Sequence, residues 1–281
     1  MLPEGTEEII ARAFAEDVGD GDHTSLSTIP AEARGGAHLL VKAEGVLAGM
    51  EMAEAICRRM DGGLNLRPLL MDGAQVHPGD VAFTVNGPTR SILLVERVLL
   101  NFMQRMSGIA TLTRAFVQAV EGTKCRVLDT RKTVPGLRQI EKWAVRIGGG
   151  TNHRMGLYDM MMIKDNHADF AGGIPQAIRR AKAYQADRAM NIPIEVETRN
   201  MREVEEALTE GGIQRIMLDN FTPEQLKEAV AFIHGRVETE ASGGITLETA
   251  RSFAETGVDF ISVGAITHSA VCLDLSLKAM G

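Results

Sequence analysis

The segment from Lys124 to His167 concentrates positive charge in an otherwise acidic chain. It holds nine lysines and arginines against four acidic residues, whereas the whole chain of 281 residues has a net charge of −7. Clustered cations repel one another unless an anion joins them, so the segment predicts a cavity that binds anions. Thr130 and the glycine run 148–150 suit close approach of the backbone and hydrogen bonds to phosphate-type groups. Arginine pairs with carboxylates through two hydrogen bonds and lysine acts as a point charge, so we expect a small polycarboxylate, a phosphate or both.

Two acidic residues suit a different task. Glu197 and Asp219 come from neighbouring predicted strands. Two carboxylates that face a cation-lined pocket suit Mg²⁺, held partly through water and bridging to a polyphosphate. Glu195 and Glu197 are two residues apart in an extended segment and therefore point the same way, which leaves the choice between them open.

Two glycine-containing loops favour a phosphate site. The first is Ser242-Gly243-Gly244 and the second is Val263-Gly264-Ala265, each directly after a predicted strand. In α/β barrels the loops after the last two strands often hold a phosphate through backbone N–H groups. Either glycine loop alone would also fit an ordinary turn, but their combined positions favour phosphate binding.

His153 is adjacent to Arg154 within the cationic segment, so it could bind an anion or donate a proton. Arg138, Lys142 and Arg146 recur every four residues on a predicted helix. That spacing is typical of a solvent-exposed helix face, so we leave these three cations outside the site.

A regular alternation of strands and helices after residue 110 positions these side chains. Strands are predicted at 126–128, 160–163, 192–196, 213–218, 237–239 and 260–263, and helices at 136–147, 174–185, 201–210, 223–233 and 247–255. Thr222-Pro223-Glu224-Gln225 is a clear helix start. About six such units favour an α/β barrel, in which polar residues at the carboxyl ends of the strands converge on one mouth.

The first 110 residues have a different pattern. Helices are predicted at 7–16, 50–60 and 91–106, and strands at 37–43, 46–48 and 80–85. Strands and helices without regular alternation indicate an α+β arrangement.

Composition argues against several classes of protein. Aromatic residues make up 4% of the chain and the net charge is negative, unlike a nucleic-acid-binding surface. The N-terminus lacks the features of a signal peptide, and no apolar run approaches the roughly 20 residues of a membrane helix. Cys57, Cys125 and Cys272 have no metal-binding spacing and are predicted to be buried thiols in a reducing compartment. We therefore expect a cytoplasmic protein that binds neither membranes nor nucleic acid.

Seven stretches of the chain form a recognisable set. They are EDVGDGDHTS (16–25), ERVLLNFMQRMSGIAT (96–111), LDTRKTVPGLRQIEKWAVRIGGGTNHRMGLYDMMMIKDNH (128–167), IEVET (194–198), IMLDN (216–220), EASGGI (240–245) and FISVGAITHSAVCLDLSLK (260–278). Together they resemble the quinolinate phosphoribosyltransferase family, the carboxylating nicotinate-nucleotide pyrophosphorylases of NAD biosynthesis. The resemblance spans nearly the whole chain, in order and with similar spacing.

The resemblance implies a pentosyltransferase that joins quinolinate to phosphoribosyl pyrophosphate. The pyridine nitrogen attacks ribose C1, magnesium pyrophosphate leaves, and the 2-carboxylate departs as CO₂ to give nicotinate mononucleotide. Mg²⁺ is the implied cofactor.

The resemblance also implies roles for individual residues. The carboxylates of quinolinate would be bound by Arg131, His153, Arg154 and Lys164, and by Arg97 from the neighbouring subunit. Lys132 would serve the phosphoribosyl pyrophosphate side, Glu197 and Asp219 would organise Mg²⁺ and the ribose, and the loops 242–244 and 263–265 would hold the 5-phosphate. The residues implied in catalysis are Lys132, Lys164, Glu197 and Asp219.

The implied architecture is an N-terminal α/β sandwich domain (1–110) followed by an open, TIM-like α/β barrel (111–269). The tail 270–281 would pack back on the first domain, and a homodimer would share its active sites between subunits. One local departure is GGIQR (211–215), which is one residue longer than the family pattern. We expect it in a loop, with little effect on the site.

Three other functions fit part of the pattern. A related phosphoribosyltransferase-like protein of molybdate transport operons would take a different substrate, but TRKTVPG and GGGTNHR favour the quinolinate enzyme. A barrel lyase or aldolase would use Lys164 as a Schiff-base nucleophile, which borohydride trapping with a carbonyl substrate would detect. A non-catalytic anion-binding protein would be expected to lack Arg131, Lys164 or Asp219, and all three are present.

Overall fold

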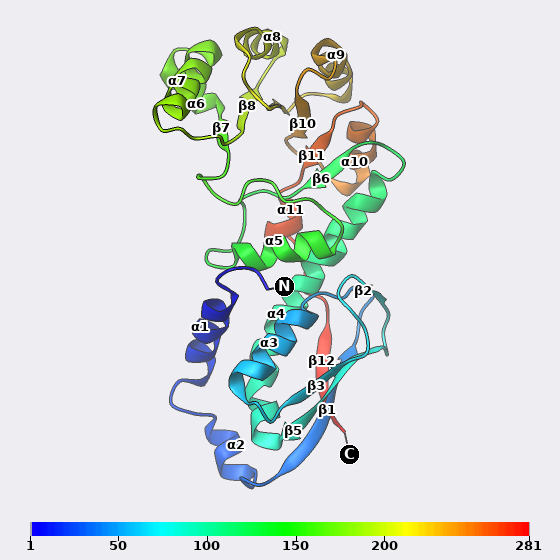
Figure 1. Cartoon of the computed structure of the whole chain (residues 1–281). Helices are drawn as coiled ribbons and strands as arrows, with labels where there is room; N and C mark the ends of the chain where they lie inside the picture. The colour runs from blue at the N-terminus through cyan, green and yellow to red at the C-terminus, as the bar shows by residue number, and fades with distance from the viewer. Residues whose placement is uncertain (1, 281) are drawn as a thin grey trace. The chain divides into compact units, whose positions relative to one another are not determined.

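The computed structural model of the chain describes residues 2–280 and divides them into two compact units (Figure 1). The first unit contains the residues up to 114, together with 133–149 and those from 265 onwards. The second contains 115–132 and 150–264. The expected boundary near residue 110 lies inside helix α4 (Thr89–Ala119), and segment 133–149, which we expected in the barrel, belongs to the first unit.

The first unit is built around a four-stranded sheet in the order β12-β1-β5-β3. Its elements are α1 (Thr6–Val18), α2 (His23–Thr28), β1 (Arg34–Val41), β2 (Gly45–Val46), α3 (Met50–Met60), β3 (Asn65–Pro68), β4 (Gln75–Val76), β5 (Val81–Pro88), most of α4, α5 (Arg138–Ile147), α11 (Ala265–His268) and β12 (Leu275–Met280). Alternate residues of β1 are buried, namely Ala37, Leu39 and Val41, so one face of the strand forms core. The sequence patterns predicted α3 at its observed bounds but missed the short strands β3 and β4.

The end of the chain returns to this sheet. Strand β12 pairs antiparallel with β1, from Gly36 opposite Met280 to Val41 opposite Leu275. Pairing along most of β1 gives strand β12 a fixed place in the first unit, because each ladder hydrogen bond satisfies a backbone group.

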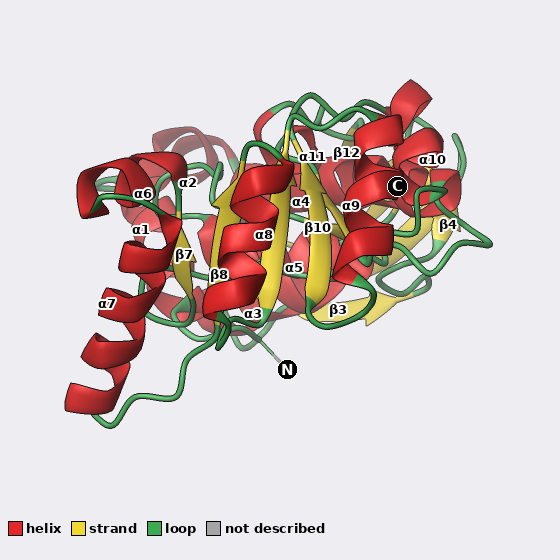
Figure 2. Cartoon of the chain, turned by 90° about the horizontal axis from the view of Figure 1, so that it is seen from above, coloured by secondary structure: helices red, strands yellow, loops and turns green. Residues whose placement is uncertain are grey.

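The second unit is a six-stranded parallel sheet in the order β6-β11-β10-β9-β8-β7. Its elements are β6 (Arg126–Leu128), β7 (Met161–Ile163), α6 (Asp165–Ala171), α7 (Ile174–Asp187), β8 (Ile194–Thr198), α8 (Met201–Glu210), β9 (Arg215–Asp219), α9 (Pro223–Ile233), β10 (Glu238–Ser242), α10 (Leu247–Ala254) and β11 (Phe260–Ser262). Figure 2 shows α8 and α9 lying over one side of these strands.

The order of the strands has the form of an open barrel. From β7 to β11 each strand lies beside its neighbour in the sequence, and the first strand, β6, then pairs with the last, β11. Strands β6 and β7 form the two edges of the sheet, so the ring is not closed. The predicted fold class, an N-terminal α/β sandwich domain followed by an open α/β barrel, is confirmed.

Local sequence rules explain the start of α9. Thr222 accepts the N–H of Gln225 through its side chain at 3.3 Å, and the Gln225 side chain accepts the N–H of Thr222 at 2.9 Å. Pro223 occupies the first helical position, where no N–H is needed. This reciprocal cap is the one that the sequence predicted, and it fixes the residue at which helix α9 begins after strand β9.

Candidate active site

The carboxyl ends of the six parallel strands lie along one edge of the second unit. In sheet order this edge is formed by the carboxyl ends of β6, β11, β10, β9, β8 and β7. It gathers most of the predicted site, namely Thr130, Arg131, Lys132, Val263, Gly264, Ser242, Gly243, Gly244, Asp219, Glu197 and Lys164. The strand order thus brings together residues that are up to 134 positions apart (130 to 264) in the sequence. Ala265 opens α11, in the first unit.

Two arginines converge at this edge. Arg154 is partly buried and donates from Nη1 to the Met160 carbonyl at 3.2 Å. Burial lowers the pKa of the Arg154 guanidinium, and the like charge of Arg131 lowers it further. Two cations held close enough to disfavour each other form a site that an anion stabilises.

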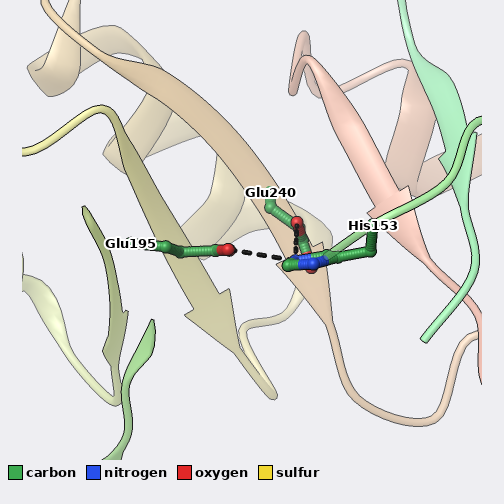
Figure 3. Close-up of side chains that lie close together, drawn as sticks. All are labelled: His153, Glu195 and Glu240. Carbon is green, nitrogen blue, oxygen red and sulfur yellow. Dashed lines mark ion pairs between the residues drawn. The ribbon is translucent and has the colours of Figure 1, made fainter. Parts of the chain in front are cut away.

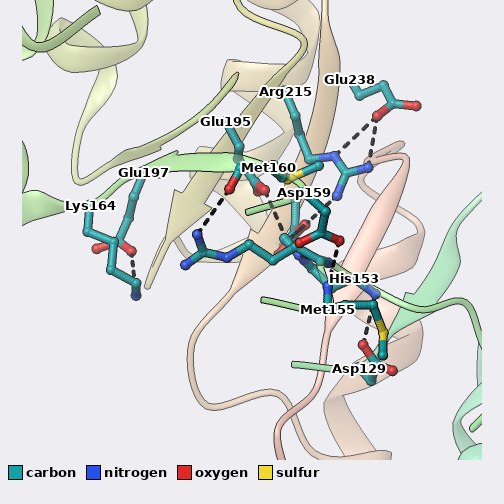
Figure 4. A network of polar contacts seen from close by, with 12 residues as sticks. Asp129, His153, Met155, Asp159, Met160, Lys164, Glu195, Glu197, Arg215 and Glu238 are labelled. Carbon is teal, nitrogen blue, oxygen red and sulfur yellow. Dashed lines mark hydrogen bonds and ion pairs between the residues drawn. The ribbon is translucent and has the colours of Figure 1, made fainter. Parts of the chain in front are cut away.

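Lys164 and Glu197 face each other from adjacent strands. Lys164 Nζ lies 3.3 Å from Glu197 Oε2, with the lysine side chain 48% exposed and the glutamate side chain 9% exposed (Figure 4). Asp219 is on the same face of the sheet as Glu197, because Glu197 pairs in register with Met217 and Asp219 is two residues further along β9. Asp219 Oδ2 accepts the Asn220 side-chain amide at 2.7 Å.

Glycine is required at one of the two predicted phosphate loops. Gly243 has a φ of +101°, and a Cβ atom there would lie 2.2 Å from Asn220 Oδ1. In the other loop, the N–H of Val263 donates to the Leu128 carbonyl at 3.0 Å, so this amide serves the sheet rather than a ligand.

The glycine run 148–150 has a packing role that we did not predict. A Cβ atom at Gly148 would lie 2.6 Å from the Ala110 carbonyl oxygen of helix α4. The Gly148 carbonyl accepts from Arg114 Nε at 2.9 Å, and Gly149 closes helix α5 by donating to Arg146 O. Close packing of two helix backbones explains why glycine is needed at Gly148.

One of the three cations on helix α5 does not lie on the solvent-exposed face where we predicted it. Arg146 is exposed, as predicted, and Arg138 is partly buried, donating to Thr133 Oγ1 at 3.0 Å. Lys142 is fully buried, so its predicted place on a solvated face is wrong. The neighbouring buried Glu141 accepts both Arg105 Nη2, at 2.7 Å, and the N–H of Val134.

A buried ion-pair cluster lies inside the barrel. His153 Nε2 is 3.0 Å from Glu195 Oε2 and 3.3 Å from Glu240 Oε2, and these three side chains are at most 4% exposed (Figure 3). Arg215 Nη1 lies 3.0 Å from the same oxygen of Glu240, and Arg215 Nη2 lies 2.9 Å from Glu238 Oε2. Register explains the grouping, because Arg215 pairs in the ladder with both Glu195 and Glu238.

The protonation of the cluster follows from two observations. Burial lowers the pKa of His153, but the hydrogen bonds and charges of Glu195 and Glu240 outweigh burial and raise it to about 9. His153 Nδ1 accepts the backbone N–H of Arg154 at 2.6 Å and therefore carries no proton. Both observations hold when the ring carries its one proton on Nε2 and the additional proton lies on Glu195, because burial and the charge of Glu240 raise the pKa of that carboxyl group.

The charge on Arg215 completes this cluster. Burial opposes that charge, but Glu195 and Glu240 outweigh burial and raise the pKa of the guanidinium. The guanidinium also lies over the Phe260 ring, 4.2 Å from its centroid. The ligand-type atoms of His153, Glu195 and Glu240 lie within 4.8 Å of one another, which would also suit a metal ion. Because Arg215 already supplies a cation to these carboxylates, we assign an ion-pair cluster rather than a metal centre.

The segment around His153 is held at both ends. Asp129, directly after β6, accepts the N–H of His153 at 2.8 Å (Figure 4). It also accepts the side-chain amide of Asn152 at 2.6 Å. Further along, Asp159 accepts the N–H groups of Met155 and Gly156. This network fixes the loop that carries Arg154.

Sequence reasoning missed Arg215 and Glu240, and it left Glu195 open. We expected GGIQR (211–215) in a loop, and 211–214 is one, but Arg215 opens strand β9 and reaches the buried cluster. The signal that could have found these residues is period two. Glu195 with Glu197, and Glu238 with Glu240, are charged residues on one face of strands whose burial predicts partners.

The remaining predictions concern Arg97 and the three cysteines. Arg97 is an exposed residue of α4 in the first unit. Cys57 and Cys125 are buried free thiols, as predicted, and burial raises the pKa of Cys57 to about 11. Cys272 is exposed, so its predicted burial is wrong.

Known proteins match the chain throughout. Residues 22–107 match the N-terminal domain, and residues 109–278 the C-terminal domain, of the quinolinate phosphoribosyl transferase family. A quinolinate phosphoribosyltransferase [decarboxylating] of Nicotiana tabacum is 48% identical over 96% of this chain and 81% of its own length. A probable nicotinate-nucleotide pyrophosphorylase [carboxylating] of Bacillus subtilis is 41% identical over 96% of this chain and 92% of its own.

Solved structures agree. NadC from Streptococcus pyogenes superposes with a TM-score of 0.94 at 37% identity, over 100% of this chain and 99% of that one. A human nicotinic acid phosphoribosyltransferase shares the fold with a TM-score of 0.62 at 14% identity, over 98% of this chain and 73% of that one.

The fold and the edge of charged strand ends define an α/β-barrel protein of the phosphoribosyltransferase type. The chain belongs to the quinolinate phosphoribosyltransferase family, which confirms the resemblance seen in the sequence.

Proposed function

We propose that this protein transfers the phosphoribosyl group of phosphoribosyl pyrophosphate to quinolinate with loss of CO₂, giving nicotinate mononucleotide and pyrophosphate. The observation that carries the proposal is the strand order that gathers Arg131, Lys164, Glu197 and Asp219 at one edge of the sheet. Arg131 also lies close enough to Arg154 for its charge to disfavour that guanidinium. Relatives covered over most of their length are named for this reaction.

Quinolinate would bind on the cationic side. Its two adjacent carboxylates suit Arg131 and Arg154, which can each form paired hydrogen bonds, while Lys164 supplies a point charge. The resemblance implies His153 in the same set. Its ring nitrogens face Glu195, Glu240 and the N–H of Arg154, so we propose that His153 contributes through Arg154.

Phosphoribosyl pyrophosphate would bind on the acidic side. Lys132, which is exposed, would meet the pyrophosphate, and the loops 242–244 and 263–265, including Thr130 nearby, would surround the 5-phosphate. Gly243 supports this, since its backbone needs both positive φ and close approach. In the second loop the Val263 amide is engaged with the Leu128 carbonyl, so we do not propose it as a donor to the phosphate.

Mg²⁺ would be held by Glu197 and Asp219. The donor set fits, because two carboxylates on one face of adjacent strands leave most coordination positions to water and phosphate oxygens. When bound, the ion would neutralise charge on the departing pyrophosphate. Lys164 balances the charge of Glu197 at 3.3 Å in the absence of substrate.

These residues would act mainly by positioning and electrostatics. Holding the pyridine nitrogen in line with ribose C1 removes several kcal/mol of barrier, because two substrates are ordered before reaction. As pyrophosphate leaves, the ribose becomes positive, and the carboxylates of Glu197 and Asp219 would stabilise that charge.

A homodimer would complete the site with Arg97. Leu157, Tyr158 and Phe170 of the second unit are 74%, 69% and 91% exposed, which is unusual for large apolar side chains. A second copy that covers them would also offer the exposed Arg97 of its first unit.

We further propose a cytoplasmic location, supported by the free cysteines. No helix within residues 2–280 is long and apolar enough to cross a membrane.

A direct assay tests the function. Purified protein is incubated with quinolinate and phosphoribosyl pyrophosphate, with and without Mg²⁺, and CO₂ and nicotinate mononucleotide are measured. Production of both in the complete mixture is expected. Protein that instead traps a carbonyl substrate with borohydride at Lys164, and forms no nucleotide, would be a barrel lyase.

A further inference from the structure

We infer that Glu195, Glu240 and Arg215 are positioning residues for quinolinate, because they hold the His153 ring in the one orientation that supports the backbone of Arg154. The inference rests on the proposed function and extends it to residues that touch no substrate.

The ring of His153 is engaged on both sides. Nε2 lies 3.0 Å from Glu195 and 3.3 Å from Glu240, and Nδ1 accepts the N–H of Arg154 at 2.6 Å. With a side chain only 4% exposed, the ring has no water to replace these partners. Turning it over would set ring carbons against two carboxylates and an amide, so this orientation is fixed.

The carboxylates are themselves held by rigid elements. Arg215 Nη1 lies 3.0 Å from Glu240, and its guanidinium stacks 4.2 Å from the Phe260 centroid. Arg215, Glu195 and Glu240 come from the central strands β9, β8 and β10, whose backbones are paired on both sides. A chain of contacts therefore runs from the barrel interior to the loop that carries Arg154.

Arg154 needs such support because its neighbour repels it. Burial and the charge of Arg131 disfavour the charged form of Arg154, and Glu195 and Asp159 offset them only in part, since the pKa of the guanidinium remains lowered. Contacts at the Met160 carbonyl and at His153 Nδ1 hold Arg154 through its side chain and its backbone. A site that is in place before its ligand arrives binds it more tightly, since less ordering remains to be done.

A matched pair of variants tests the inference. Glu240→Gln keeps the shape of the side chain but removes the charge that faces His153 Nε2. Glu238→Gln is the control, since Glu238 lies on the same strand and pairs with the same Arg215 but is 48% exposed and has no part in the ion pairs of His153. We expect Glu240→Gln to raise the KM for quinolinate about 10- to 100-fold, the effect of a small displacement of a binding group. The KM for phosphoribosyl pyrophosphate should stay within about twofold in both variants.

A merely structural role would give a different pattern. It predicts equal losses for both substrates, or lower activity at unchanged KM, and either result would overturn the inference. Where Glu240→Gln does not unfold cooperatively, Glu240→Asp is measured in its place, with the same expectation, because the shorter side chain withdraws the carboxylate from His153.

A spectroscopic measurement separates this inference from the proposed function. In protein labelled with ¹⁵N-histidine, the wild-type His153 should show an unprotonated Nδ1 and a protonated Nε2 by NMR. Glu240→Gln should shift both resonances, and Glu238→Gln should leave them in place. A protonated Nδ1 in the wild type would overturn the inference, whatever the enzyme assay shows. Wild-type protein that shows the expected resonances but does not turn over quinolinate would contradict only the proposed function.

Discussion

Glu195 and Glu197 lie two residues apart on strand β8 and point to the same face, yet they have different partners. Glu195 is sealed in the barrel 3.0 Å from His153 Nε2, whereas Glu197 lies nearer the carboxyl end of the strand, 3.3 Å from Lys164 Nζ. The two glutamates therefore differ in how deeply they lie within the barrel. We infer that the deeper one supports the loop that carries Arg154, and we propose the shallower one for substrate and Mg²⁺.

Arg154→Ala should weaken quinolinate binding strongly. Each charge-assisted hydrogen bond contributes roughly 1.5–3 kcal/mol, so the KM for quinolinate should rise about 10- to 150-fold. Steady-state kinetics with each substrate varied in turn would measure this. Arg202→Ala is the control, because that arginine is 78% exposed on the outside of α8. Equal effects of the two substitutions would remove Arg154 from the site.

Nicotinate should be a poor substrate. It lacks the 2-carboxylate, so binding would leave one buried cation without its partner, and discrimination should reach on the order of 10⁴-fold in kcat/KM. Competition between the two acids in one assay gives the ratio directly. Comparable turnover of nicotinate and quinolinate would show that the Arg131–Arg154 pair does not recognise a dicarboxylate.

Chelation of divalent metal should abolish turnover, and added Mg²⁺ should restore it. Glu197→Gln should raise the Mg²⁺ concentration for half-maximal activity by about tenfold, which corresponds to about 1.4 kcal/mol, because one of two carboxylates loses its charge. Glu205→Gln, an exposed position on α8, is the control. Full activity in the presence of a chelator would exclude this role for Glu197 and Asp219.

Gly243→Ala should damage the phosphate loop. Any L-residue is strained at a φ of +101°, and the new Cβ would also lie 2.2 Å from Asn220 Oδ1. The KM for phosphoribosyl pyrophosphate should rise while that for quinolinate changes little. Gly235→Ala is matched for backbone strain, with a φ of +70° and open space around the added carbon. An equal effect of the two substitutions would mean that the clash with Asn220 is unimportant.

Stability should fall at alkaline pH through the additional proton that the pair of His153 and Glu195 holds. The pKa of His153 is raised from 6.5 to about 9 in the folded protein by Glu195 and Glu240, against the effect of burial. The stabilisation is therefore fully present below about pH 6.5 and is lost as pH rises towards 9, by up to about 3 kcal/mol. Urea unfolding between pH 6 and 9 would measure the loss in the wild type and in His153→Gln. Parallel profiles would show that this cluster holds no extra proton.

Periodicity and local signals were sufficient for much of the fold. Helices α3, α8 and α9 and strand β6 have the predicted bounds, because amphipathic spacing, caps and short apolar runs are local properties of the chain. Strands β3 and β4 were missed, since short, partly exposed strands owe their existence to the neighbour they pair with.

The sequence alone determined which chemical groups are present and that they follow parallel strands, and from these it predicted the acidic and cationic sides of the proposed site. Only the tertiary structure decided which of these groups meet. Arg215 and Glu240 are 25 residues apart, and strand register, which no local pattern contains, places them 3.0 Å from each other. Lys142 on a helix and Gly148 at its end were likewise assigned by their packing, because burial depends on what the rest of the chain brings against them.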